Sequence, residues 1–212
     1  MTPFDLFFLA SVLFVAALSV RIAASALRRR WETSRRLARL LGWFVASYAV
    51  VLLAVSLALP RRFYAPGERR CFDDWCVAAM EAKIADRSTA VPCPAGGGGR
   101  DWIVTVEVSS TARRVRQRAA DARAELEDAQ GSRYQPCAAP LPHGTGPARL
   151  LSGELAPGES FYVFLPFRLP SGRAPAGLVV HHGDIPGVVI VAADRSLLHR
   201  PALQRLAVEQ TR

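Results

Sequence analysis

Charge is absent from one long stretch of the sequence. Leu40–Leu59 has 20 residues and no charged side chain, and Pro60 and two arginines follow it. A helix rises about 1.5 Å per residue, so this stretch spans about 30 Å, the thickness of the hydrocarbon core of a bilayer. A core helix of a soluble protein is seldom apolar on every side over such a length. The sequence therefore predicts a transmembrane helix at about residues 40–59.

Positive charge is also missing ahead of the first apolar segment, residues 4–27. A cleaved signal peptide begins with a basic region, whereas the only charge here is Asp5. The unbroken apolar run is Leu6–Val20, and Arg21 follows it, from where its side chain can reach the headgroups. We therefore favour a first transmembrane helix at about 4–27 over a signal peptide.

Lysine is nearly absent: Lys83 stands against 26 arginines. Together with abundant Ala, Gly and Pro, this composition suggests a GC-rich bacterial genome. Residues 1–62 hold nine Arg against Asp5 and Glu32, or +7, whereas residues 63–212 hold 18 basic and 16 acidic residues, or +2. A nucleic-acid-binding protein carries a basic stripe on its folded domain. The distribution of charge therefore does not indicate a nucleic-acid-binding surface, and we expect no nucleic acid as a partner.

The segment between the two apolar stretches, residues 28–39, holds six Arg and one Glu. Short arginine-rich loops stay in the cytoplasm, so this segment is expected on the inside. Arg61, Arg62, Arg69 and Arg70, which follow the second apolar stretch, favour the opposite orientation. We predict a multi-pass protein of the bacterial inner (cytoplasmic) membrane with a cytoplasmic loop at 28–39. A juxtamembrane linker at 63–70 and a periplasmic domain at 71–212 follow.

Cysteine is absent from the first 70 residues. The four cysteines, Cys71, Cys76, Cys93 and Cys137, all lie in the predicted periplasmic part. An even number of cysteines confined to an oxidising compartment indicates disulfides. Three pairings are possible. We favour Cys71–Cys76 and Cys93–Cys137, the second of which closes a loop of about 43 residues and contributes about 3–4 kcal/mol in the chain-entropy model.

Short β-type runs separated by turns follow the cysteines. The clearest is Asp101–Ser109, which alternates with period two, and Pro166 within Phe161–Leu169 indicates an edge strand or a bulge. Residues 112–130 are ambiguous, because their composition favours a helix while part of them alternates like a strand. Further short strands are expected at Val77–Ile84, Leu150–Leu155, Leu178–His182 and Val188–Ala192. This spacing predicts a β-sandwich.

Two motifs follow the alternating strand: D-x-x-G-x-x-Y, which is Asp128, Gly131 and Tyr134, and L-x-P-G-E-S, which is Leu155, Pro157, Gly158, Glu159 and Ser160. In this order they resemble a bacterial domain family of unknown function, over roughly residues 100–182. Its members are Ig-like β-sandwiches on secreted lipoproteins and membrane-anchored proteins. RRCFDDWCV and the later SLLHRP also resemble uncharacterised acidobacterial membrane proteins. The resemblance implies an extracytoplasmic all-β Ig-like sandwich after a two-helix transmembrane hairpin, and no catalytic residues.

Candidate site residues are few. One candidate is a metal site formed by Cys71 and Cys76 with Asp73 or Asp74. The four residues between the two cysteines are within the spacing found at zinc sites, but no second Cys/His pair with matching spacing is present. His181, His182 and Asp184 form another weak candidate, because adjacent strand residues point to opposite faces. We therefore predict no metal and no cofactor. Arg114, Arg116 and Arg118 would share one face of a strand and could contact lipid headgroups or an acidic partner.

No Ser/His/Asp arrangement or phosphate-binding loop is evident, so we expect no enzyme. The first hypothesis is a membrane-anchored binding or assembly module of the bacterial envelope, with the lipid bilayer and an envelope protein as partners. The alternative is a metal-binding or redox membrane protein that uses Cys71 and Cys76 with nearby Asp or His. A third possibility is an accessory subunit that packs through Gly42, Ala46 and Ala49 of its second helix.

Overall fold

The computed structural model describes residues 3–85, 93, 98–137, 140–142, 148–182, 189–191, 198 and 200–209. The chain forms two compact units. One comprises Met1–Arg61 with Ile185–Pro201, and the other comprises Arg62–Asp184 with Ala202–Arg212.

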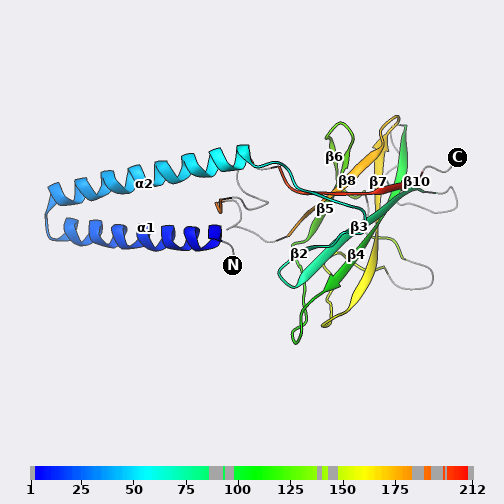
Figure 1. Ribbon diagram of the computed structural model, residues 1–212, viewed down its shortest axis with the longest axis horizontal. Coiled ribbons are helices and arrows are strands. Elements are labelled where there is room, and N and C mark those ends of the chain that lie inside the picture. The colour runs from blue at the N-terminus through cyan, green and yellow to red at the C-terminus, as the bar shows by residue number, and fades with distance from the viewer. Residues whose placement is uncertain are drawn as a thin grey trace. The chain divides into compact units, whose positions relative to one another are not determined.

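The first unit is built on two antiparallel helices, α1 (Pro3–Leu27) and α2 (Trp31–Ala58) (Figure 1). Both are long and apolar enough to cross a membrane. They contact each other through ring pairs, Phe7 with Tyr48 and Phe14 with Phe44, whose centroids are 5.7 and 4.7 Å apart. The Tyr48 hydroxyl also donates a hydrogen bond to the carbonyl of Val189 at 2.6 Å.

The connection between the helices is shorter than the predicted loop at 28–39. Only residues 28–30 are outside the helices, with Arg29 in a left-handed conformation at φ 56°. The next residues, WETSRRLAR, are rich in Arg, Leu and Ala, which favour helix, so α2 begins nine residues before the apolar stretch. Arg35, Arg36 and Arg39 therefore lie on a helix.

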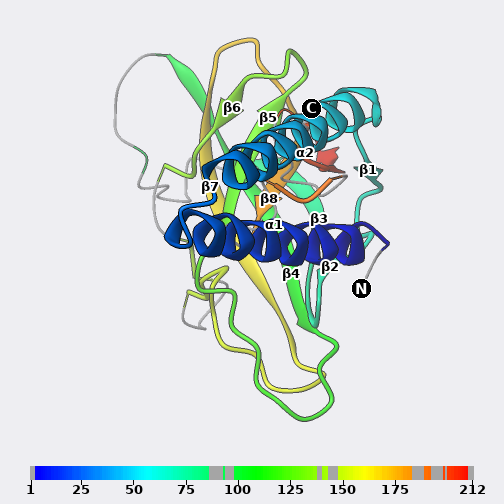
Figure 2. The same ribbon diagram turned by 90° about the vertical axis from the view of Figure 1, so that its left-hand side faces the viewer.

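The second unit is a β-sandwich of two sheets, whose strands Figures 1 and 2 show from two sides. The first sheet has the order β1-β9-β8-β5-β6: Phe63–Tyr64, Leu203–Arg205, Pro175–His181, Arg123–Asp128 and Arg133–Tyr134. The second has the order β10-β3-β4-β7, which are Ala207–Glu209, Trp75–Ile84, Gly99–Ser110 and Ser160–Pro170. A short strand, β2 (Arg70–Phe72), also pairs with β3.

One hydrophobic core lies between the sheets. Alternate residues of β4, from Trp102 to Val108, are buried together with Val163, Leu165 and Phe167 of β7. Leu126 of β5 and Leu178 of β8 contribute from the other sheet. The period-two pattern of β4 thus turns one face of the strand into the core, as the sequence predicts.

The C-terminal segment passes from one sheet to the other. β9 pairs with β1 and β8, and after Leu206 the chain continues as β10, which pairs parallel to β3. Gln204 of β9 is fully buried. Its side-chain amide donates to the Val77 carbonyl at 3.0 Å and accepts from the Ala79 N–H at 2.9 Å, so it bonds to the β3 backbone before β10 begins.

The same tetrapeptide, APGE, forms the same turn twice, at Ala65–Glu68 and Ala156–Glu159. In each, the glutamate carboxylate accepts the N–H of the alanine, at 2.7 and 2.8 Å. In each, the glutamate N–H donates to the alanine carbonyl at 3.0 Å. Gly67 and Gly158 have φ of 76° and 74°, which glycine adopts at little cost at the third position of a type II turn.

Several local predictions need correction. Residues 63–70 are more than a linker, because β1, an APGE turn and the start of β2 lie within them. Leu150–Leu155 is not a strand, since the Gly153 N–H bonds back to Leu150 in a turn and only Leu155 bridges to Gln117. Residues 189–191, the described part of the strand expected at Val188–Ala192, form turns and bends. Within 112–130 only β5 is a strand, and residues 112–122 form no helix.

Candidate functional site

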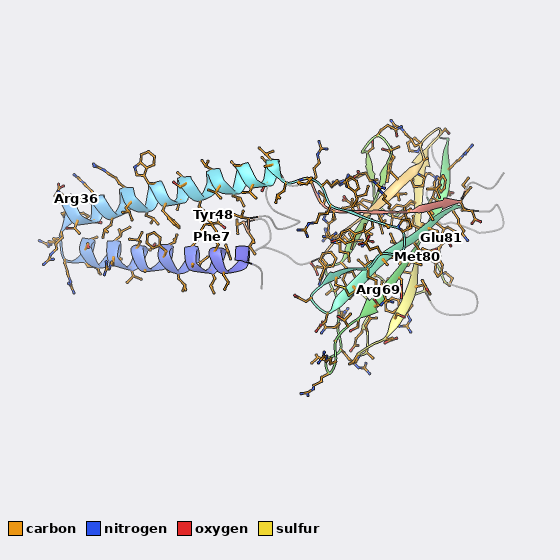
Figure 3. All side chains as sticks on the ribbon, viewed as in Figure 1. Phe7, Arg36, Tyr48, Arg69, Met80 and Glu81 are labelled. Carbon is orange, nitrogen blue, oxygen red and sulfur yellow. A yellow bond between two sulfur atoms is a disulfide. The ribbon has the colours of Figure 1, made fainter. Side chains whose placement is uncertain are left out.

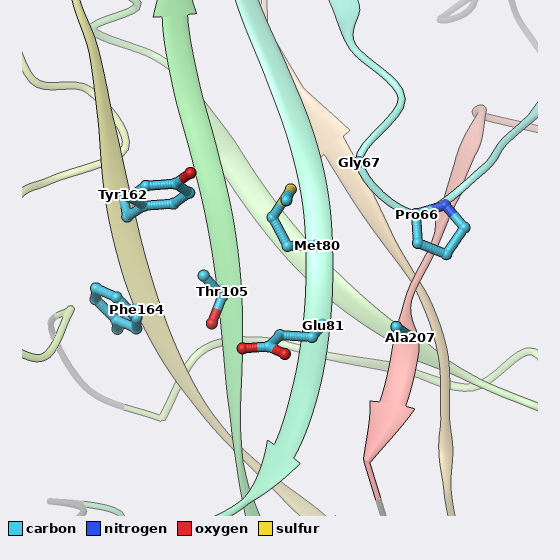
Figure 4. Close-up of a pocket in the computed structure, with 8 residues that line it drawn as sticks. All are labelled: Pro66, Gly67, Met80, Glu81, Thr105, Tyr162, Phe164 and Ala207. Atoms are coloured by element: carbon cyan, nitrogen blue, oxygen red, sulfur yellow. The ribbon is translucent and has the colours of Figure 1, made fainter.

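A hollow of about 550 Å³ lies on the outer face of the β10-β3-β4-β7 sheet (Figure 4). It is lined by side chains of three neighbouring strands, Met80 and Glu81 of β3, Thr105 of β4, and Tyr162 and Phe164 of β7. Pro66, Gly67 and Ala207 complete it. Aromatic rings and a thioether in a shallow hollow are typical of protein-binding surfaces.

The two aromatic residues follow from the period of β7. Phe161, Val163 and Leu165 point into the core, so the intervening Tyr162 and Phe164 point outward. Tyr162 is 50% exposed, although a large aromatic side chain gains stability from burial. Packing of the hydrophobic core therefore does not account for the aromatic residues on the outer face of β7.

A β-bulge places the residues of β3. The register with β4 shifts between Ala79 and Glu81, so Met80 has no cross-strand partner. Because of the extra residue, both Met80 and Glu81 turn away from the core, between buried Ala79 and Ala82. In Figure 4, Met80 lies towards Tyr162 and Glu81 extends towards Thr105.

The first APGE turn contributes a wall of the hollow. The Gly67 N–H donates to the Ala79 carbonyl at 2.8 Å, which attaches the turn to the bulge. A Cβ at Gly67 would lie 3.8 Å from the Met80 sulfur, so the turn approaches Met80 closely.

Charged pairs surround the apolar centre. Lys83 bridges Glu81 and Glu209, each at 3.1 Å, and Arg69 contacts Glu107 at 3.0 Å (Arg69 and Glu81 are labelled in Figure 3). The hydrogen bonds from Lys83 to Glu81 and Glu209 raise the pKa of the Lys83 amine. An apolar centre with a charged rim is the arrangement expected of a docking surface.

The cysteines form two disulfides, Cys71–Cys76 and Cys93–Cys137, which are the pairs favoured from the sequence. Cys71 and Cys76 face each other across the β2–β3 hairpin. Asp73 and Asp74 form its turn, with Asp73 at φ 55° and the Asp74 carbonyl accepting the Thr111 N–H at 2.9 Å. The sulfurs of this segment are thus bonded to each other, which leaves no thiolate for a metal.

The two histidines are directed to different partners. His181 Nε2 lies 3.5 Å from a Glu125 oxygen, whereas His182 Nδ1 lies 2.7 Å from Asp121 Oδ1. The His182 ring packs on Trp75, with centroids 5.1 Å apart. Asp184 lies outside the described residues. Among the described residues, no three His, Cys, Asp or Glu side chains gather as they would around a metal ion.

The arginine row predicted at Arg114, Arg116 and Arg118 rests on a strand that the structure does not contain. All three side chains are exposed, in the irregular segment before β5. Arg116 contacts Glu154 at 3.4 Å. Without a strand, no period-two rule aligns the three guanidinium groups.

Asp128 of the D-x-x-G-x-x-Y motif is the most connected polar residue of the hairpin. Its Oδ1 accepts the N–H groups of Gln130 and Ser132, at 2.9 and 2.8 Å. Its Oδ2 accepts the Tyr134 hydroxyl at 3.0 Å and lies 3.3 Å from Arg173. The motif residues therefore hold the β5–β6 turn together, with Gly131 at φ 83°.

Met80, Tyr162 and Phe164 are functional candidates that only the structure reveals. For β7 the signal was present, since F-Y-V-F-L places an aromatic residue on both faces of a strand. For Met80 no signal existed, because a bulge is not visible in the periodicity of β3.

Comparisons with known proteins give fold-level similarities only. No protein-family model matches the sequence, and no curated protein matches it. Among solved structures, a secreted protein of Mycobacterium tuberculosis is 17% identical, with a TM-score of 0.43, over 59% of this chain and 93% of that protein. An uncharacterised β-sandwich protein of Clostridium difficile is 12% identical, with a TM-score of 0.38, over 59% and 89%. A conserved hypothetical protein of Bacillus anthracis is 17% identical, with a TM-score of 0.40, over 56% and 88%.

Proposed function

We propose that this chain is a membrane-anchored, non-enzymatic binding or assembly module of the bacterial envelope. Its helices α1 and α2 form a transmembrane hairpin in the inner membrane, and its Ig-like sandwich lies in the periplasm. The outward-facing apolar side chains of both helices, such as Leu13 of α1 and Val50 of α2, support membrane insertion. The two disulfides support an oxidising compartment for the sandwich.

The observation that carries the binding role is the hollow around Met80, Tyr162 and Phe164. A partner protein that covers it would bury two aromatic rings and a methionine, the residue types enriched at interface centres. The charged pairs of Lys83 and Arg69 would form the rim.

In vivo photocrosslinking tests this role. A photoreactive amino acid at Tyr162 should give a discrete crosslinked product, because Tyr162 lies at the centre of the proposed interface. The matched control is Val115, which is 66% exposed on the irregular segment before β5 and should give none. Repeated absence of a product at Tyr162, with the protein present in the membrane fraction, would refute the binding role of this face.

The alternative function, a metal or redox protein, draws on Cys71 and Cys76. Their disulfide excludes them as metal ligands in the oxidised state. Metal analysis of the purified full chain separates the hypotheses: stoichiometric zinc or copper that is lost in Cys71→Ser would favour the alternative.

A further inference from the structure

Seven arginines gather at the closed end of the helical hairpin. They are Arg21 on α1, Arg28, Arg29 and Arg30 in the turn, and Arg35, Arg36 and Arg39 on α2. Glu32 is the only acidic residue between Arg21 and Arg39, so the net charge of this end is 7 − 1, or +6. All seven side chains are exposed, and Figure 3 shows Arg36 among them.

These arginines differ from those of the sandwich in their partners. In the sandwich, Arg69, Arg168 and Arg173 contact the carboxylates of Glu107, Asp101 and Asp128. Residues 21–39 are all described, and no salt bridge occurs between Glu32 and any of the seven arginines there. No carboxylate within residues 21–39 therefore neutralises these arginines, and their guanidinium groups can accept an anionic ligand.

The geometry of the hairpin orders the arginines along its axis. The ring pairs Phe7–Tyr48 and Phe14–Phe44 place Arg21 opposite residues 34 to 37, a range that includes Arg35 and Arg36. Arg39 adjoins the apolar stretch that begins at Leu40. The turn at Arg28–Arg30 lies about ten residues further along, or roughly 15 Å beyond Arg39.

We propose that Arg21, Arg35, Arg36 and Arg39 form a binding site for the phosphate groups of anionic phospholipids. This inference rests on the proposed membrane anchoring of the hairpin. The headgroup layer extends only about 5–7 Å beyond the hydrocarbon core, so these four guanidinium groups contact it and the turn arginines do not. Arg28, Arg29 and Arg30 act on the lipid charge at longer range, through a screened field.

The residue types suit this ligand. A guanidinium group binds two phosphate oxygens at once, and its long stem lets it reach the headgroup level from a helix. Arg35 and Arg39 are four residues apart, so they lie on the same side of α2.

The test uses the full chain in nanodiscs of equal parts phosphatidylglycerol and phosphatidylcholine, with native mass spectrometry to count the lipids that stay bound. We expect phosphatidylglycerol to be retained roughly tenfold over phosphatidylcholine, and less so at high salt. The variant R35Q/R36Q/R39Q should remove most of the preference. R28Q/R29Q/R30Q removes the same charge at the turn and should reduce it only in part. R113Q/R114Q/R118Q on the sandwich should leave it unchanged.

Three results would overturn the inference: no preference in the wild type, a preference that R35Q/R36Q/R39Q leaves unchanged, or an equal loss in the turn variant. Inorganic phosphate should lower the preference no more than sodium chloride of equal ionic strength does, and a stronger effect would assign the site to free phosphate instead. If R35Q/R36Q/R39Q does not enter nanodiscs, R35K/R36K/R39K keeps the charge and should retain a weaker preference, because lysine cannot bind phosphate in a bidentate manner. A full preference in that variant would also contradict the site.

The two proposals fail in different ways. A wild-type chain that does not enter nanodiscs at all would refute the membrane anchoring. A chain that enters but retains both lipids equally would refute the arginine site alone.

Discussion

The buried side chain of Gln204 accepts the backbone N–H of Ala79, so a residue of one sheet completes the hydrogen bonding of a strand in the other. The same side chain donates to the Val77 carbonyl. The Ala79 carbonyl accepts the N–H of Gly67 in the first APGE turn. The bulge that forms the hollow is thus held by two other segments, β9 and the first APGE turn.

Gln204→Leu should destabilise the sandwich by about 2–3 kcal/mol, because it leaves a buried N–H and a buried carbonyl without partners. Gln204→Glu keeps an acceptor for Ala79 but places an acidic group opposite the Val77 carbonyl, so it should also destabilise. Thermal unfolding followed by the fluorescence of Trp75 and Trp102, which are buried in the sandwich, measures both. An unchanged melting temperature for Gln204→Leu would show that the two groups find other partners.

Asp128 should make the stability of the sandwich depend on pH. Burial alone would raise the pKa of Asp128, but hydrogen bonds from Ser132, Tyr134 and Gln130 and the charge of Arg173 outweigh it and hold the pKa below its ordinary value. The ionised carboxylate therefore stabilises the folded state at neutral pH, and this contribution is lost as the pH falls through the lowered pKa.

Asp128→Asn should lower the stability at neutral pH by about 1–3 kcal/mol, since a neutral amide cannot replace every bond. It should also flatten the decline towards acidic pH. Both effects can be measured from the melting temperatures of the wild type and the variant at neutral and acidic pH. The exposed Glu154→Gln is the control. Parallel curves for wild type and Asp128→Asn would assign the pH dependence to other groups.

Gly158→Ala should destabilise the sandwich by about 1–2 kcal/mol, because its φ of 74° is costly for any residue with a Cβ. The space around it is open, since no atom lies within 4 Å of an added Cβ, so the effect isolates backbone strain. Gly98→Ala is the matched control. Its Cβ would meet only the Ser171 side chain at 3.8 Å, without a positive φ, and its cost should be within a few tenths of a kcal/mol. Equal melting temperatures for the two variants would contradict the assigned turn.

Neighbouring residues of β7 should separate stability from binding. Val163 is fully buried, so Val163→Ala should cost about 2 kcal/mol of folding free energy. Tyr162→Ala should change the stability by less than about 0.5 kcal/mol, yet reduce partner capture by a photocrosslinker placed at the nearby Thr105. Undiminished capture with Tyr162→Ala would place the partner on another surface.

The sequence predicts the sandwich well where one residue decides a local geometry or a long pattern repeats. The alternation of β4, the edge position of Pro166 and the turn at Gly131 each follow from a rule about two or three residues. Pro166 lies in β7, at the end of the ladder, where its carbonyl accepts the N–H of Cys137. The two long apolar segments likewise predict the helices α1 and α2.

Features that depend on long-range contacts could not be predicted. β1 and β10 are two and three residues long and exist only because each pairs with a distant strand. Leu150–Leu155 is predicted to form a strand, but the Gly153 N–H bonds back to the Leu150 carbonyl in a turn, and only Leu155 bridges to Gln117. The hollow depends on the bulge at Met80, and a bulge leaves no trace in composition.

Both terminal pairings of the sandwich are parallel, β1 with β9 and β10 with β3, and this has a mechanical consequence. If the chain is held before β1 and tension acts beyond β10, the two strands of each pair are drawn in opposite directions along their length. Their hydrogen bonds, among them that from Leu203 to the Arg62 carbonyl, then bear the load together in shear, where an antiparallel hairpin would open one bond at a time. The sandwich would resist being pulled away from the segment before β1 until β9 and β10 slide free in a single step.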